Sequence, residues 1–209
     1  TPERVWGFYG HRLMLYRKVI PHAGFALLKR WAERMPNGAS VFTSNVDGQF
    51  QKAGFDPESV HECHGSLHHL QCLKPCCKKV WSADEFMPDV DVRYCLLRNA
   101  PPLCPQCGGM ARPNVMMFND WDWLDSRSGR QEARQRHWLC SVQRPVVLEI
   151  GAGTTIPSVR YFSQSMVHSH GAKIVRINPF ESQVAPGAGV GLSMAAAAGL
   201  TAIDSLLEG

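Results

Sequence analysis

Two groups of cysteines near the middle of the chain constrain its fold more than any other feature. Cys104 and Cys107 lie in CPQCGG, a knuckle in which turn amides point at the thiolates and the glycines permit a sharp reversal. Upstream, the stretch CLKPCC places Cys72 with Cys76 and Cys77. Two such groups roughly 30 residues apart predict a tetrahedral site for zinc. Because four thiolates leave no open position on the metal, this zinc would be structural rather than catalytic.

The identity of one ligand depends on the turn that contains Pro75. Cys76 and Cys77 both suit the spacing, and Pro75, which presets the turn, favours Cys76. The predicted zinc ligands are therefore Cys72, Cys76, Cys104 and Cys107. The isolated Cys63, Cys95 and Cys140 are expected to be buried and to pack as small apolar residues.

The composition is that of a globular protein. Of the 209 residues, 44% are apolar and 19% are charged, and the length suits one large domain or one domain with a small insertion. The net charge is only +4 and the basic residues are scattered, so nucleic acid is not expected as a partner. No stretch has the apolarity of a membrane span. The first residues, TPERVWGFYGHR, carry no secretion signal, and the cysteine pairing points to metal rather than disulfides, so a cytoplasmic location is expected.

Strand-like and helical segments alternate along the rest of the chain. Residues 2–34 predict two helices separated at Pro21, and the charge-alternating residues 126–139 predict a third. The small residues of 182–203 predict a loop and a helix packed on a sheet. Strands are expected at 39–43, 59–65, 112–118, 144–150 and 172–177.

This alternation predicts an α/β fold with a Rossmann-like parallel sheet that carries helices on both faces. The sheet domain would comprise residues 1–65 and 115–209. Residues 66–114 would be an inserted zinc-ribbon module.

Polar residues or glycines follow three of the expected strands. Asn45 and Asp47 follow the first, the turn 151–153 follows another, and Asn178 follows the last. Taken alone, Asn-x-Asp-Gly is ordinary turn chemistry, because Asn and Asp side chains satisfy nearby backbone groups. Open α/β sheets, however, bind ligands just beyond the carboxyl ends of their strands. The convergence of three such turns on one edge favours a ligand site.

The order of motifs along the chain resembles that of the bacterial-type sirtuins, the NAD-dependent protein deacylases. NVDG is followed by HGS, the cysteine module, CGGMARPNVMMF, EIGAG and VRINP, and the resemblance extends from about residue 21 onward. It implies NAD and zinc as cofactors and an acyl-lysine protein or peptide as substrate. His64 matches the catalytic histidine of the family, which acts as general base on a ribose hydroxyl after the acyl oxygen has displaced nicotinamide. The products would be nicotinamide, deacylated lysine and O-acyl-ADP-ribose.

The resemblance also assigns binding residues. Val115 and Phe118 match residues that line the acyl-lysine tunnel, while the acyl group itself is not identified by the sequence. The residues expected to bind NAD are Ser44, Asn45, Val46, Asp47, Gly151, Ala152, Gly153 and Asn178.

The chain departs from the family pattern at several positions. Ser44 stands in place of Gln, Ala152 and Gly153 in place of Thr and Ser, and Asn119-Asp120 in place of the Gly-Glu that pairs with substrate peptide. The family's first strand and its loop, G-A-G-x-S-x-x-S-G-I-P-D-F-R, do not occur in the sequence. The expectation is that the chain lacks about one strand and one loop before residue 1, and that in this form it binds NAD weakly and turns over negligibly.

Two other functions remain open at this point. An NAD hydrolase or ADP-ribosyltransferase would use the same departure of nicotinamide with a different acceptor. A zinc-bearing interaction module without catalytic activity would suit the missing cofactor loop. His64, Asn45 and Asp47 favour an enzyme, and an upstream reading frame containing the loop motif would decide for it.

Overall fold

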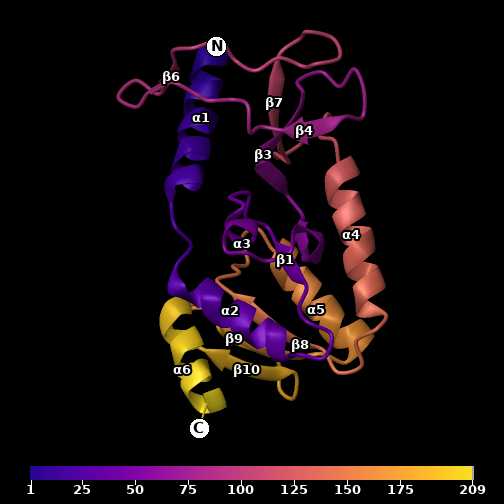
Figure 1. The fold of residues 1–209 in the computed structure, drawn as a ribbon. Coiled ribbons are helices and arrows are strands. Elements are labelled where there is room, and N and C mark those ends of the chain that lie inside the picture. The colour runs from indigo at the N-terminus through magenta and orange to yellow at the C-terminus, as the bar shows by residue number, and fades with distance from the viewer. Residues whose placement is uncertain (209) are drawn as a thin grey trace. The chain divides into compact units, whose positions relative to one another are not determined.

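The computed structural model describes residues 1–208 and divides the chain into two compact units (Figure 1). The first unit comprises Thr1–Ile20 and Thr43–Ala133, and the second comprises Pro21–Phe42 and the residues from Arg134 onward. Strand β1 (Val41–Thr43) and helix α4 (Ser126–Leu139) each contain a point of division. This division differs from the domain boundaries expected from the sequence, because 1–20 and 43–65 belong to the same unit as the cysteine module.

The first unit is organised around an antiparallel sheet with the strand order β4-β3-β7. Its central strand, β3, pairs with both neighbours, and a bulge between Ser66 and Leu70 interrupts its pairing with β7. A second antiparallel pair joins β5 and β6. The elements of this unit are α1 (Pro2–Lys18), α3 (Gln49–Lys52), η1 (Pro57–Ser59), β2 (Val60–Glu62), β3 (Gly65–Cys72), β4 (Val80–Ser82), β5 (Val90–Asp91), β6 (Leu96–Leu97) and β7 (Ala111–Val115).

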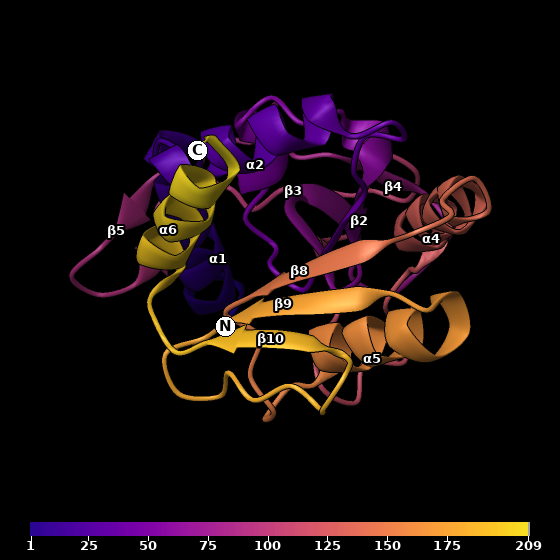
Figure 2. The same ribbon diagram turned by 90° about the horizontal axis from the view of Figure 1, so that it is seen from below.

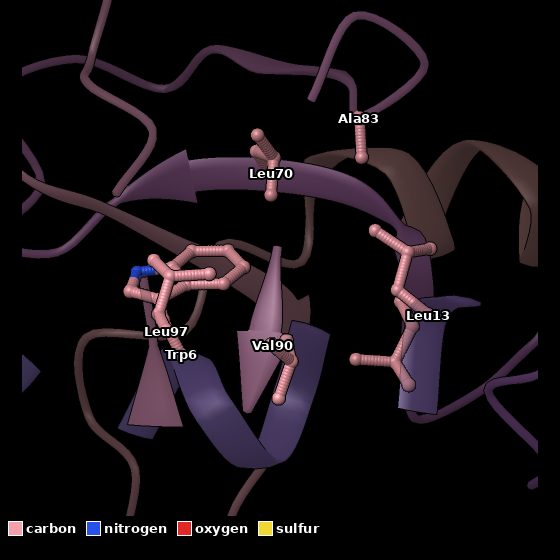
Figure 3. Close-up of a cluster of buried hydrophobic side chains, with 7 residues drawn as sticks. Trp6, Leu13, Leu70, Ala83, Val90 and Leu97 are labelled. Atoms are coloured by element: carbon pink, nitrogen blue, oxygen red, sulfur yellow. The ribbon is translucent and has the colours of Figure 1, made fainter. Parts of the chain in front are cut away.

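An apolar core joins α1 to these strands. Trp6 and Leu13 of α1 face Leu70 of β3 and the β5–β6 pair (Figure 3). The indole nitrogen of Trp6 donates to the Ala111 carbonyl at 3.2 Å, so this large side chain is buried without an unsatisfied donor. The full cluster consists of Trp6, Leu13, Leu67, Leu70, Ala83, Val90 and Leu97. The core fixes β3 and β7, which carry the residues next to His64.

The second unit contains a parallel sheet with the order β10-β9-β8 (Figure 2). Val147 of β8 packs with residues of α5 on one face, whereas Gly199 of α6 lies against Ile177 of β9, whose side chain points to the other face. Helices therefore cover both faces, which confirms the predicted fold class. The elements are α2 (Ala23–Arg34), β8 (Val146–Ile150), α5 (Ser158–His170), β9 (Lys173–Ile177), β10 (Gly189–Leu192) and α6 (Ala196–Glu208).

Most of the predicted elements are present, with several differences. The strands expected at 39–43 and 59–65 pair with each other as β1 and β2, outside the parallel sheet. The break between α1 and α2 falls at Pro21, and α4 covers the expected residues 126–139. The strand expected at 112–118 is β7, but it pairs antiparallel with β3 instead of joining the parallel sheet. The segment 182–203, expected to be loop and helix, also contains strand β10.

Among residues 1–208, no helix combines the length and the apolarity needed to cross a lipid bilayer.

Candidate functional site

His64 lies between β2 and β3, where backbone hydrogen bonds fix the chain on both sides. The Cys63 amide donates to the Thr43 carbonyl at 2.9 Å, and the Met116 amide donates to the His64 carbonyl at 3.0 Å. Gly65 has a φ of +80°, and a Cβ there would lie 2.0 Å from the Asn114 carbonyl oxygen. Only glycine fits this close approach of β3 to β7. The imidazole is thus carried by a backbone that has little freedom to move.

The pKa of His64 is lowered from its ordinary value. The largest cause is the partial burial of the ring, which disfavours the charged imidazolium. A hydrogen bond to the Ser44 backbone has the smaller, opposite effect and raises the pKa. The ring is therefore neutral at pH 7, which is the form that accepts a proton.

The turn that carries Asn45 and Asp47 is attached to β3 immediately after His64. The Leu67 amide donates to the Val46 carbonyl at 2.9 Å, and the His68 ring nitrogen Nε2 lies 2.9 Å from the Asp47 carbonyl oxygen. One carboxylate oxygen of Asp47 accepts from the Gln49 amide at 3.0 Å and so helps to start α3. The ordinary turn role of Asp47 is thus present, and its role toward NAD stays a prediction. Asn45 is exposed.

The two residues expected to line an acyl-lysine tunnel have different surroundings. Val115 pairs with Gly65 across β3 and β7 and packs against the core of the first unit. Phe118, three residues further on, is 86% exposed. Next to it, Asn119 has a φ of +56°, the left-handed conformation that the family's glycine adopts readily and that asparagine tolerates. The tunnel roles of Val115 and Phe118 stay predictions.

In the second unit, the glycine turn 151–153 is tied to the end of β9. The Gly151 amide donates to the Ile177 carbonyl at 2.9 Å, and Gly151 has a φ of +67°. The buried Asn178 side chain donates to the Ala152 carbonyl at 3.0 Å and accepts from the amides of Phe180 and Glu181, both at 2.9 Å. Asn178 therefore shapes the turn.

A buried ionic network under this turn was not predicted from the sequence. Glu149 is fully buried and forms ion pairs with Arg176, its cross-strand neighbour on β9, and with Arg160 at the start of α5. Arg160 also contacts Glu181, whose carboxylate accepts from the Thr154 hydroxyl at 2.9 Å. The signal was present, since VVLEI carries one glutamate and KIVRI carries an arginine between apolar residues of the strand.

The structure thus brings the predicted residues together in two sets. Ser44, Asn45, Val46, Asp47, His64 and Val115 lie around one end of β3 in the first unit. Gly151, Ala152, Gly153 and Asn178 lie at the ends of β8 and β9 in the second unit.

Four cysteines form a cluster with the dimensions of a zinc site. The sulfur atoms of Cys72, Cys76, Cys104 and Cys107 all lie within 4.8 Å of one another. Two pairs of these sulfurs, Cys72 with Cys107 and Cys76 with Cys104, are 3.7 Å apart. A tetrahedral ion with Zn–S bonds of about 2.3 Å requires sulfurs roughly 3.8 Å apart. The residues therefore fit zinc, and the cluster contains Cys76 rather than Cys77.

The turn amides of the CPQCGG knuckle point at a thiolate, as expected. Hydrogen bonds from the Cys107 and Gln106 backbones lower the pKa of Cys104 to about 7, against the opposing effect of burial. Such a thiol is readily deprotonated for metal binding.

The expectation for the remaining cysteines was largely wrong. Cys95 and Cys140 are exposed, and Cys63 is half-buried. Cys95 occupies the turn between β5 and β6, and Cys140 follows the last residue of α4.

A comparison with known protein families agrees with these observations. The model of the Sir2 family matches residues 1–135 of the chain. The chain belongs to the Sir2 family.

Individual Sir2 relatives extend the likeness to the remaining residues. An NAD-dependent protein deacylase of Aquifex aeolicus is 27% identical over 210 residues, which covers 100% of this chain and 78% of the relative. The NAD-dependent protein deacylase of Mycobacterium leprae is 36% identical over 120 residues, or 57% of this chain and 46% of the relative. A solved Sir2 homologue, a mutant in complex with 2'-O-acetyl ADP ribose, has a TM-score of 0.70 at 23% identity and covers 99% of this chain and 74% of its own. The structural likeness shows the sirtuin fold.

Proposed function

We propose that this protein is an NAD-dependent protein lysine deacylase that forms nicotinamide and O-acyl-ADP-ribose. The observation that carries the proposal is His64, a ring kept neutral by burial and held by backbone bonds beside the Asn45–Asp47 turn. A general base needs a neutral imidazole within reach of its substrate. Membership of the Sir2 family adds support.

His64, Asn45 and Asp47 each have a separate role in the proposed reaction. Bound NAD supplies the ADP-ribosyl group that accepts the acyl group. His64 takes a proton from a ribose hydroxyl at the ring nitrogen that is not engaged with the Ser44 backbone. Asn45 contributes its exposed amide to orient the ribose or a water molecule. Asp47, with one carboxylate oxygen used by the turn, holds the nicotinamide carboxamide with the other.

In the second unit, the backbone of 151–153 is proposed to bind the adenosine half of NAD. In the first unit, Ser44 and Val46 are further proposed contacts of NAD. Glycines at 151 and 153 allow backbone amides to approach phosphate and ribose closely. Asn178 keeps the turn in shape through its bond to Ala152. Zinc on the four cysteines stabilises the fold and takes no part in the reaction.

The test compares His64→Ala with His168→Ala, an exposed histidine of α5, in the protein at its natural length. His64→Ala should lower deacylation of an acetyl-lysine peptide by about a hundredfold or more, the usual contribution of a general base. Its circular dichroism spectrum and zinc content should match those of the wild type, and His168→Ala should retain full activity.

Because the pKa of His64 lies below 6.5, the wild-type rate should rise with pH only in the range below about 6.5 and then level off.

Separate measurement of the products distinguishes the alternatives. Free ADP-ribose, or ADP-ribosylated protein, formed in place of O-acyl-ADP-ribose would identify a hydrolase or an ADP-ribosyltransferase. Unchanged deacylation in His64→Ala would remove this residue from the mechanism.

We also propose that the protein resides in the cytoplasm. All eight cysteines are free of disulfides, and four of them are arranged for metal, which suits a reducing compartment. Cell fractionation with an antibody against the protein tests this location.

A further inference from the structure

The segment after β7, residues 116–124, presents aromatic side chains to solvent and is called the aromatic loop below. Trp121 is 95% exposed and Phe118 is 86% exposed. Large side chains exposed to this degree and grouped within four residues are unusual on a protein surface and mark contact sites.

Buried side chains of the first unit hold the aromatic loop in a fixed shape. Arg112 of β7 binds Asp120 through two bonds, of 2.7 Å and 3.0 Å, and both side chains are 8% exposed. The Gln71 amide donates to the Asp122 carbonyl at 2.7 Å, and its oxygen accepts from the Leu124 amide at 3.0 Å. Asn114 donates to the Leu124 carbonyl at 2.9 Å. Exposure of Trp121 is therefore built into the fold and is not the result of a loose loop.

The loop begins beside the proposed catalytic residue. Its first residue, Met116, donates its amide to the His64 carbonyl, and Val115 pairs with Gly65. A polypeptide whose acyl-lysine reaches His64 consequently passes close to the aromatic loop.

The charge of this segment is opposite to that of the chain as a whole. The protein has a net charge of +4, yet residues 116–124 contain two aspartates and no lysine or arginine, and a third aspartate, Asp125, follows directly. Arg112 neutralises Asp120. Asp122 and Asp125 are exposed, and within residues 1–208 the Asp122 carboxylate has no hydrogen-bond or ion-pair partner.

We propose that Trp121, assisted by Asp122, is a specificity-determining residue that binds a lysine or arginine side chain of the substrate next to the acyl-lysine. An indole face attracts a cation, and a nearby carboxylate adds to the attraction. The inference rests on the proposed deacylase function and adds the class of substrate, namely acyl-lysine segments with a basic neighbour.

The test uses pairs of acetyl-lysine peptides. The two peptides of a pair differ at one position, where one carries arginine and the other glutamine. The pairs cover the two positions on either side of the acetyl-lysine. For at least one position, the wild type should prefer arginine by roughly five- to tenfold in kcat/KM, through KM, as expected for one cation–π contact. Trp121→Ala should lose this preference, Trp121→Phe should retain part of it, and Asp122→Asn should weaken it. Tyr94→Ala, which removes an exposed aromatic from the β5–β6 turn, is the matched control and should keep the preference.

Fluorescence anisotropy with labelled versions of the same peptides measures binding without turnover. An equal affinity of the wild type for both peptides, or an unchanged preference in Trp121→Ala, would overturn the inference and leave the deacylase function intact. Preferential binding through Trp121 without deacylation of any peptide would instead overturn the proposed function alone.

Discussion

At the scale of single residues, His69 of β3 is the histidine whose pKa is most clearly shifted by the fold. Its pKa is lowered to about 4, chiefly by burial, with Arg127 adding to the shift and Glu62 opposing it. Its ring nitrogen Nδ1 is buried and has no hydrogen-bond partner among the described residues. The folded protein therefore holds this ring neutral, whereas the unfolded chain protonates it near pH 6.5.

The shift makes stability depend on pH. Above pH 6.5 the ring is neutral in both states and the stability is fully present; as the pH falls from 6.5 toward 4, only the unfolded chain takes up the proton, and stability is lost. This loss should amount to about 2 kcal/mol by pH 5. Urea unfolding of the wild type and of His69→Gln at pH 7 and pH 5 measures it. The difference in free energy of unfolding between the two pH values should be smaller in the variant, and equal differences would contradict the assigned pKa.

At the scale of secondary-structure elements, the pairing of β3 with β7 connects the proposed catalytic residue to the rest of the site. Gly65 permits the pairing, the Met116 amide closes it over His64, and the aromatic loop starts where it ends. Any change that separates the two strands should displace His64 and Val115 together.

Gly65→Ala tests this dependence. Its Cβ would lie 2.0 Å from the Asn114 carbonyl oxygen, so the strands must move apart. We expect a destabilisation of roughly 3 kcal/mol or more, in the range of severe core defects. Gly38→Ala is the control, because Gly38 also has a positive φ, +63°, but has open space around it, and it should cost only about 1 kcal/mol. Thermal unfolding followed by circular dichroism measures both, and similar losses would show that strand contact at Gly65 is unimportant.

At the scale of the whole molecule, the cysteine cluster joins segments far apart in sequence. Cys72 is the last residue of β3 and Cys76 follows it, while Cys104 and Cys107 precede β7, so one metal ion would close a loop of more than thirty residues. Metal binding of this kind contributes directly to the free energy of folding.

Adjacent cysteines offer a matched pair of variants. The purified wild type should contain about one zinc per chain. Cys76→Ser should lose most of the metal and unfold at a lower temperature, whereas Cys77→Ser, outside the cluster, should keep both the metal and the stability. Elemental analysis together with thermal unfolding measures these properties. Full zinc content in Cys76→Ser would assign the fourth ligand to another residue.

Local patterns predicted much of this molecule. Cysteine spacing identified the cluster, and helix and strand periodicity located α4, β8 and β9 within a few residues. These features depend on neighbouring residues in the sequence, or on the spacing of cysteines that a metal site requires.

The remaining features depend on contacts between distant residues. Alternation in ARPNV indicates a strand but not its partner, so the antiparallel pairing of β7 with β3 was missed. Strand β10 was missed because its glycines have low strand propensity. The structure nevertheless requires glycine at position 189, since a Cβ there would lie 1.8 Å from the Ile174 carbonyl oxygen. The ion pairs of Arg160 with Glu149 and Glu181 could not be predicted, because only the folded chain brings these residues together.

The way Asn178 holds the turn 151–153 has a consequence for substitutions in this part of the chain. One side chain, through bonds to the Ala152 carbonyl and to two amides beyond β9, specifies the path of the turn. A different side chain at position 152 would leave these three bonds in place, whereas loss of the Asn178 amide would remove all of them at once. The path of the turn should therefore tolerate substitution at position 152 better than at position 178.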